Sequence, residues 1–133
     1  MIISNNLKVI LIGDSPANTY EEIEVKRFVS ESKGIYWHNS ANFSKKTHYQ
    51  DELNALIKKK ITVHAFYVDN KAKKNFEEIA HSTGGKTQRL DIESENGSKI
   101  LTDLVNIELL RNIGGKEKGN VLVNAYKNKY NAF

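Results

Sequence analysis

Hydrophobic positions along the chain alternate between strand-like runs and helix-like spacings. Residues 7–12, Leu-Lys-Val-Ile-Leu-Ile, form a nearly continuous apolar run that ends at Gly13-Asp14-Ser15-Pro16. Such a run is typical of a buried strand in a parallel sheet. Residues 61–68 predict a second strand, and residues 87–92 predict a shorter third.

Helical spacing of apolar residues marks the segments between and after these strands. Apolar residues three or four positions apart predict helices over about residues 47–59 and 71–82. Apolar positions over 98–113 cover much of the helix circumference, which predicts a helix packed on several sides, and Gly114-Gly115 ends it. A last helix is expected over about 119–130. Strands that alternate with helices favour an α/β fold with right-handed crossovers.

The connection over residues 14–46 is long and irregular, with a helical stretch predicted over roughly 21–32. Connections of this length tend to carry function. This one leaves the carboxyl end of the first strand, where open α/β sheets place their ligands. Four of its residues are therefore candidate binding residues: Ser15, Tyr20, Tyr36 and Trp37. The alternative is that the aromatic side chains only pack the insertion against the rest of the domain.

Composition narrows the class of protein. The 133 residues are 39% hydrophobic and contain no Cys, so a single globular domain over 1–133 is expected, and disulfides, Cys-ligated zinc and thiol nucleophiles are excluded. No apolar stretch approaches the ~20 residues of a transmembrane helix. The N-terminal MIISNNLK lacks the pattern of a signal peptide. We therefore expect a cytoplasmic protein with no membrane partner.

The positive charge does not indicate a nucleic-acid partner. The formal net charge is +4, but the basic residues are mostly Lys in short clusters, and only three are Arg. Because base reading favours the bidentate guanidinium group, such a surface argues against sequence-specific nucleic-acid binding.

Motifs that point to catalysis or metal binding are incomplete. Gly85-Lys86-Thr87 resembles the end of a P-loop, but Ala80 stands where that motif needs a Gly, and the triplet follows a predicted helix instead of opening one. His48 with Glu52, and Glu77 with His81, are pairs on single helices, whereas zinc needs a third convergent ligand. His64 lies in a predicted strand and is expected to be a packed, hydrogen-bonded histidine of the core or of the sheet edge.

Gly13-Asp14-Ser15 resembles the first block of GDS-type (SGNH) esterases, in which the Ser is the nucleophile. No Asp in the chain is followed by a His three positions later, and no Gly-x-Asn-Asp is present for an oxyanion hole. A serine without a positioned base is inert at neutral pH. A small hydrolase that uses Ser15 is therefore the alternative function and not the expected one.

An ordered set of segments is spread over most of the chain: VILIGDSP (9–16), YQDEL (49–53) with Leu56, ITVHAF (61–66), FEEIA (76–80), TGG (83–85), Leu90, and ELLRNIGG (108–115) followed by Tyr126 and Tyr130. In this order the set resembles the C-terminal half of a von Willebrand factor A (vWA) domain. The resemblance implies a Rossmann-like three-layer sandwich. Its sheet would be a partial vWA-type sheet of at least three mainly parallel strands, with helices on both faces.

The vWA family binds a divalent cation at the carboxyl edge of the sheet, in a metal-ion-dependent adhesion site with ligands from three loops. Asp14 matches the Asp that follows the family's fourth strand, and it is the candidate metal ligand here. The D-x-S-x-S ligands are absent, as are the strands that would carry them and the family's Thr ligand. Since a hard cation takes about six oxygen ligands, the resemblance implies an incomplete site. No cofactor is firmly implied, and Mg²⁺ or Mn²⁺ is expected only if another chain completes the site.

The family's strand order is 3-2-1-4-5-6, so the three strands expected here correspond to 4-5-6. The strand over 7–12 then becomes an apolar sheet edge guarded only by Lys8, and such edges pair readily with other strands. We therefore expect a non-enzymatic protein-interaction module of vWA type, truncated or split. Its partner would be a second copy in a homo-oligomer, or a chain that supplies the missing N-terminal half. The alternative is that residues 1–5 fold back over the edge.

Overall fold

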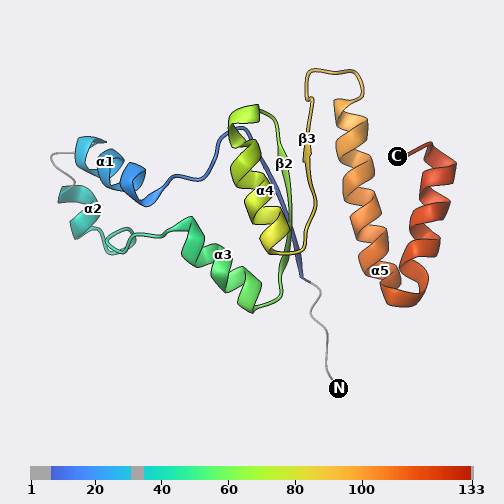
Figure 1. Cartoon of the computed structure of the whole chain (residues 1–133), viewed down its shortest axis with the longest axis horizontal. Helices are drawn as coiled ribbons and strands as arrows, with labels where there is room; N and C mark the ends of the chain where they lie inside the picture. Colours follow the sequence, from blue (N-terminus) through green and yellow to red (C-terminus); the bar gives the residue numbers. More distant parts are fainter. Residues whose placement is uncertain (1–6, 31–34, 133) are drawn as a thin grey trace. The chain divides into compact units, whose positions relative to one another are not determined.

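A computed structural model describes residues 7–30 and 35–132, except for the side chains of residues 30, 35 and 36. The chain has an α/β fold with a three-stranded parallel sheet in the order β1-β2-β3 (Figure 1). It divides into two compact units, Leu7–Thr87 and the segment from Gln88 onward. The expectation of one domain over 1–133 stays a prediction.

The first unit contains most of the sheet and the insertion. Its elements are β1 (Lys8–Gly13), α1 (Tyr20–Ser30), α2 (Ile35–Asn39), α3 (Tyr49–Lys58), β2 (Thr62–Tyr67), the 3-10 helix η2 (Asn70–Ala72) and α4 (Lys73–Ser82); β3 (Thr87–Arg89) begins at its last residue. These bounds confirm the expected strands and helices within a few residues, except that β3 is shorter. The short helix α2 was not expected.

Strands β1 and β2 run parallel, with Lys8 opposite Thr62 and Gly13 opposite Tyr67. The expectation that residues 7–12 form a buried strand is wrong, although the parallel pairing is confirmed. Val9, Ile10 and Ile12 are 41%, 38% and 45% exposed. The physical reason is position: β1 lies at the edge of the described sheet and has β2 as its one neighbour, so its apolar side chains lack a second flanking strand.

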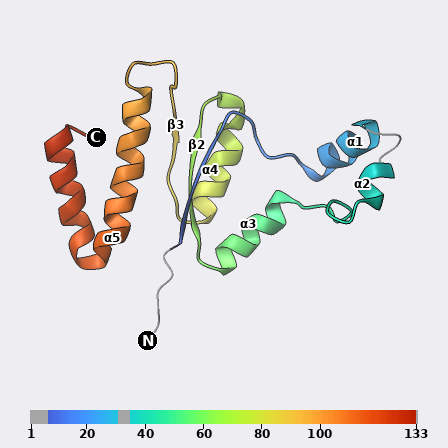
Figure 2. The same cartoon turned by 180° about the vertical axis from the view of Figure 1, so that it is seen from behind.

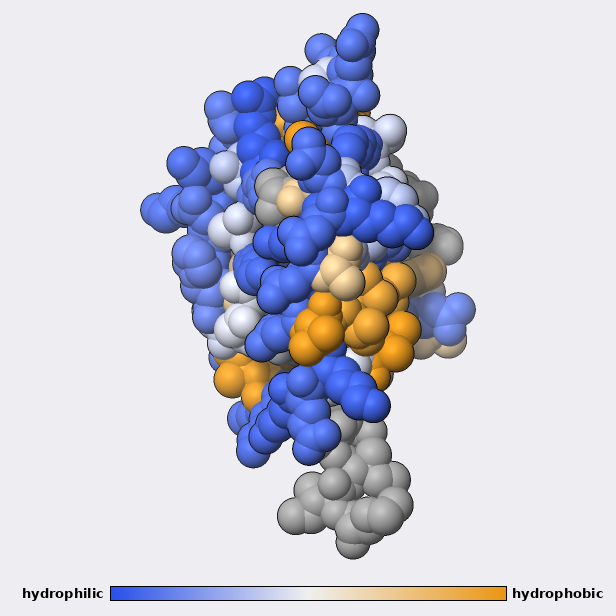
Figure 3. All heavy atoms as spheres, turned by 90° about the vertical axis from the view of Figure 1, so that its right-hand side faces the viewer, coloured by the Kyte–Doolittle hydropathy of each residue, from blue (hydrophilic) through white to orange (hydrophobic). Residues whose placement is uncertain are grey.

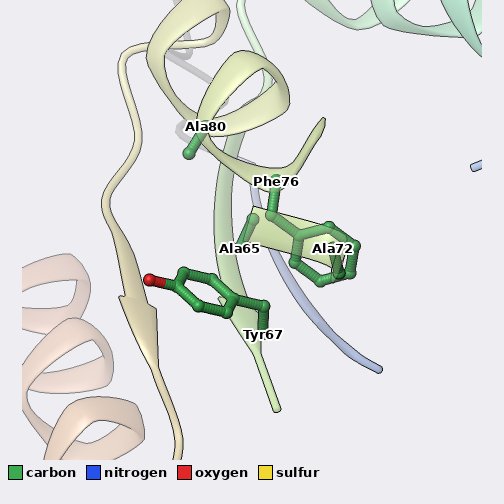
Figure 4. Packing of buried hydrophobic residues seen from close by; sticks show 5 residues of the cluster. All are labelled: Ala65, Tyr67, Ala72, Phe76 and Ala80. Atoms are coloured by element: carbon green, nitrogen blue, oxygen red, sulfur yellow. The ribbon is translucent and has the colours of Figure 1, made fainter. Parts of the chain in front are cut away.

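Helix α4 packs on the sheet through a cluster of small and aromatic side chains. In Figure 4, Phe76 and Ala80 of α4 and Ala72 of η2 face Ala65 and Tyr67 of β2. Phe76 and Ala80 lie four positions apart, so they share one helix face. The alanines let the helix axis approach the strand closely, and all five residues are buried. Whether a helical layer covers the opposite face of the sheet stays a prediction.

The turn after α4 brings the chain back against β2. Gly84 has a φ of 71°, the left-handed conformation typical of a helix end. A Cβ on Gly85 would lie 1.8 Å from the carbonyl oxygen of Val63, so only glycine fits there. The triplet Gly85-Lys86-Thr87 thus connects a helix to a strand, which confirms that it is not placed as a P-loop would be.

His64 is a core histidine, one of the two positions that the sequence predicted. It is 4% exposed, and its Nδ1 accepts a hydrogen bond of 3.1 Å from the backbone N–H of Lys86. The bond fixes the start of β3 beside β2, where the N–H of Ala65 also donates to the carbonyl oxygen of Lys86 at 2.8 Å.

The second unit is dominated by α5 (Gly97–Tyr130), which folds back on itself (Figures 1 and 2). The reversal is at Gly115, whose φ of 59° and ψ of −157° break the helix. The predicted end at Gly114-Gly115 and the separate last helix are therefore confirmed. A Cβ on Gly119 would lie 2.7 Å from the carbonyl oxygen of Arg111, so the two limbs are in backbone contact there.

The first limb of α5 is not packed on all sides. Leu109 and Ile113 are 52% and 77% exposed, so the expectation of a helix packed on several sides is wrong for these residues. Val121 on the second limb is 66% exposed. Figure 3, which views the molecule from the right-hand side of Figure 1, shows apolar atoms gathered within a mostly hydrophilic surface.

A polar network joins the two limbs of α5. Asp103 is 3% exposed, and its carboxylate accepts hydrogen bonds from the Lys99 ammonium at 2.6 Å and from the Tyr126 hydroxyl at 2.8 Å. The Asn106 amide donates to the same Tyr126 hydroxyl at 3.0 Å. The hydrogen bond from Lys99 is the main reason that the pKa of Asp103 lies below its usual value; burial opposes the shift, and Tyr126 adds to it.

Candidate functional site

The open edge of β1 is defined by the direction of its backbone groups. The carbonyl oxygen of Leu7 accepts from the N–H of Thr62 at 3.2 Å, and that of Gly13 accepts from the N–H of Val68 at 2.9 Å. Odd-numbered residues of β1 therefore direct their backbone groups toward β2. Because successive residues of a strand point their N–H and C=O groups to opposite sides, those of Ile10 and Ile12 point away from β2.

Both faces of this edge are apolar. Val9 and Leu11 lie on the face of the sheet that carries α4, since Leu11 packs against the α4 cluster. Ile10 and Ile12 lie on the other face, because side chains alternate along a strand. An edge with outward backbone groups and exposed β-branched side chains on both faces is a template for another strand.

A cavity of about 420 Å³ lies on the Val9–Leu11 face of this edge. Its walls combine β1 with apolar residues of four other elements: Ile23 of α1, Leu53 and Leu56 of α3, Val63 of β2, and Ile79 of α4. Polar residues of the insertion and α3 also line it: Asn18, Thr47, His48 and Glu52. An apolar cavity with a few polar groups is the usual form of a binding pocket.

His48 is the polar residue of this cavity with an unmet hydrogen-bonding group. It precedes α3 and makes no side-chain cap to that helix. Its Nδ1 is buried and has no hydrogen-bond partner within the described residues. The Tyr20 ring stacks on it with centroids 4.3 Å apart, which places this candidate binding residue beside the cavity's histidine.

Tyr49 connects the cavity to α4. Its hydroxyl donates to the carboxylate of Glu78 at 3.3 Å. Burial is the main cause that raises the pKa of Tyr49, and the negative charge of Glu78 raises it further. The phenol therefore stays protonated through the neutral range.

Trp37 packs within the insertion. Its ring meets Phe43 edge-on with centroids 5.7 Å apart, and the Arg27 guanidinium lies 5.5 Å from its centroid. These contacts favour the alternative that the aromatic residues pack the insertion down. The Lys46 ammonium binds the Glu24 carboxylate nearby, and this hydrogen bond is the largest cause that lowers the pKa of Glu24.

The side chain of Tyr36 falls outside the described residues, so this candidate stays a prediction.

Ser15 and Asp14 line a second cavity, of about 240 Å³, at the carboxyl end of β1. The loop is held there because the N–H of Ala17 donates to the Asn75 side chain of α4 at 2.9 Å. No histidine is among the residues lining this cavity. Within the described part of the chain, no group of three or more His, Cys, Asp or Glu residues is arranged to hold a metal ion.

We predict that the isolated chain binds Mg²⁺ or Mn²⁺ weakly or not at all. Asp14 is exposed, and a single carboxylate supplies too few of the ~6 oxygen ligands that these cations take. Isothermal titration of each cation into the chain should give no more heat than titration into Asp14→Ala. A tight site that is lost in Asp14→Ala would contradict the prediction and assign further ligands.

The vWA resemblance predicts an open edge at residues 7–12, but nothing in the sequence predicts the cavity beside it. The spacing of His48 and Glu52 indicates only an incomplete metal pair, and it does not indicate that Ile23 of α1 and Val9 of β1 line one cavity with His48. The open position of Ile10 and Ile12 follows from the register with β2, which sequence alone does not set.

No protein-family model, curated protein or solved structure matches this chain. The functional argument therefore depends on the geometry of the β1 edge. No helix in the described ranges is long and apolar enough to cross a membrane.

Proposed function

We propose that this chain is a non-enzymatic protein-interaction module of vWA type, truncated or split, that binds an extended segment of polypeptide as an additional strand on β1. The observation that carries the proposal is the outward direction of the Ile10 and Ile12 backbone groups on an apolar, exposed edge. In strand addition, backbone hydrogen bonds supply affinity, and pockets for alternate side chains supply specificity.

The cavity beside Val9 and Leu11 gives this edge a means of selection. Alternate side chains of an added strand lie on the same face as Val9 and Leu11, next to the cavity of about 420 Å³. An apolar side chain is the group that this lining accommodates. The partner is thus a β-forming segment with apolar residues at alternate positions.

The remaining parts of the proposal draw on the sequence and on the strand order. The vWA assignment draws on the ordered segments and agrees with the strand order β1-β2-β3. A cytoplasmic location agrees with the absence of Cys. Nucleic acid is not a proposed partner, since the basic residues are mostly Lys. A hydrolase using Ser15 gains no support, because its cavity is lined by no general base of the His type.

Selection of displayed peptides tests the proposal. A phage library of heptapeptides is panned against the full chain, and the enriched peptides are then titrated against Ile10→Pro and Ile10→Ala. Proline removes the outward N–H of Ile10 and places a ring on the edge, a position where sheets tolerate proline. Alanine removes the same side chain but keeps the N–H.

Enriched peptides should bind the wild-type chain and Ile10→Ala, and should bind Ile10→Pro at least tenfold more weakly. Far-ultraviolet circular dichroism checks that both variants keep the wild-type fold. Equal binding to Ile10→Pro, with the fold intact, would place the interaction elsewhere and would overturn the proposal. If the chain is a monomer and no peptide is enriched, the proposal is also contradicted.

A further inference from the structure

We infer that the strand bound at β1 is β1 of a second copy of this chain, paired antiparallel so that Ile10 of each copy lies opposite Ile12 of the other. The inference rests on the proposed function, because it uses the same edge. It adds the identity of the partner and the register of the pairing.

The backbone of β1 permits this register. In an antiparallel ladder, a pair of residues that both point toward the partner strand exchanges two N–H···O bonds. Ile10 and Ile12 both point outward, as the bonds of Leu7 and Gly13 to β2 establish. Two-fold symmetry then forms the Ile10–Ile12 pair twice, once on each side of the axis. Each copy therefore contributes the same β1 edge to the interface.

The side chains match themselves in this register. Leu11 of one copy meets Leu11 of the other at the axis, and Val9 lies opposite Gly13, over which the Phe76 ring already packs on this face. On the opposite face, Ile10 and Ile12 cover one another. Ile10 and Ile12 are 38% and 45% exposed, and the pairing removes part of this surface from water.

Charge selects this register over its neighbour. With Ile10 opposite Ile12, continuing the pairing one residue past the end of β1 at Gly13 brings Asp14 of one copy across from Lys8 of the other. Opposite charges then come together at both ends of the ladder. Shifting the strands by two residues, so that Ile10 lies opposite Ile10, puts the charge of Lys8 across from Ile12. Opposite charges across a ladder stabilise it, whereas a charge against an exposed isoleucine does not.

The first measurement is the mass of the full chain by light scattering after size exclusion at micromolar concentration. A dimer of about twice 15.1 kDa is expected, and Ile10→Pro should shift it to a monomer. A complementary charge pair tests the register. Lys8→Asp and Asp14→Lys should each be mainly monomeric alone, because like charges then face each other, and an equimolar mixture should form a dimer.

Disulfide trapping reads the register directly, because the chain contains no Cys of its own. Leu11→Cys should form a cross-linked dimer under mild oxidation, since directly opposite non-hydrogen-bonded residues have their Cβ atoms close. A mixture of Val9→Cys and Gly13→Cys should cross-link to the heterodimer. Should Leu11→Cys fail to fold, this mixture still tests the register. Cross-linking of Ile10→Cys in preference to Leu11→Cys would favour the shifted register and overturn this one.

The outcomes separate the inference from the proposed function. A monomer whose β1 edge binds displayed peptides would refute the second copy as partner and leave strand addition standing. A dimer that persists in Ile10→Pro would use another surface and would refute the inference. A monomer that binds no peptide and shows slow amide exchange at Ile10 and Ile12 would mean that the chain covers its own β1 edge. That result would refute both the inference and the proposed function.

Discussion

Replacing Gly85 by alanine is expected to destabilise the first unit by about 3 kcal/mol or more, enough to leave little folded protein in a domain of ordinary stability. The added Cβ would lie 1.8 Å from the carbonyl oxygen and 2.6 Å from the carbonyl carbon of Val63. Both are backbone atoms of β2, a central strand, so neither side can move without breaking the pairing of the sheet.

Gly84→Ala is the matched control, because it adds the same methyl group one residue earlier. No atom lies within 4 Å of a Cβ at Gly84, and the strain there comes only from its φ of 71°. This conformation costs an alanine about 1–2 kcal/mol. Urea unfolding followed by circular dichroism should give a clearly lower midpoint for Gly85→Ala. Equal midpoints for the two variants would mean that the turn does not approach β2 as described.

The neighbouring glycines also show how far sequence reasoning reaches. A helix stop at Gly84-Gly85 was predictable, because paired glycines after an amphipathic stretch commonly end a helix. The need for glycine at 85 was not, since it depends on how closely the turn packs against Val63. Local propensity places the elements, whereas the distance between elements follows from packing that spans many residues.

The same distinction explains the error on β1. A continuous apolar run such as Val9–Ile12 is typical of a strand with neighbours on both sides, and its composition is the same at an edge. Only the number of pairing strands decides its exposure, and the described sheet gives it one. The vWA resemblance indicates the edge position indirectly, because this chain lacks the strands that would flank residues 7–12 in that family.

The insertion was the least predictable part. Its aromatic residues were recognised, but whether they bind or pack depends on their partners in space. Trp37 meets Phe43 and Arg27, whereas Tyr20 meets His48 beside the cavity. No periodicity connects these residues, so the sequence left both alternatives open.

Removal of the Tyr126 hydroxyl should destabilise the α5 hairpin. In Tyr126→Phe, the Asp103 carboxylate loses the hydroxyl donor at 2.8 Å, and the Asn106 amide loses its acceptor at 3.0 Å. Leaving buried polar groups without partners costs about 1–3 kcal/mol. Tyr130→Phe is the control, because Tyr130 is half exposed and its ring lies tilted against that of Tyr126, with centroids 4.8 Å apart. Its loss of one hydroxyl should change the free energy of unfolding little.

Asp103 makes this network sensitive to acid. Its pKa is lowered in the folded protein, chiefly by the hydrogen bond from Lys99 and further by that from Tyr126, against the opposing effect of burial. A carboxyl whose folded pKa lies below its ordinary value of 3.8 stabilises the fold at every pH above that value. The stabilisation is lost as the pH falls below 3.8 and through the folded pKa, where the carboxyl is protonated in both states.

Urea unfolding of the wild-type chain, Asp103→Asn and Tyr126→Phe at pH 7 and near pH 2 measures this dependence. Asp103→Asn should be less stable than the wild type at pH 7, because the amide cannot accept from Lys99 and Tyr126 as a carboxylate does. The difference should shrink as the pH falls, to the extent that the wild-type carboxyl becomes protonated and loses its charge. A gap between wild type and Asp103→Asn that is the same at both pH values would show that the charge of Asp103 does not hold the two limbs of α5 together.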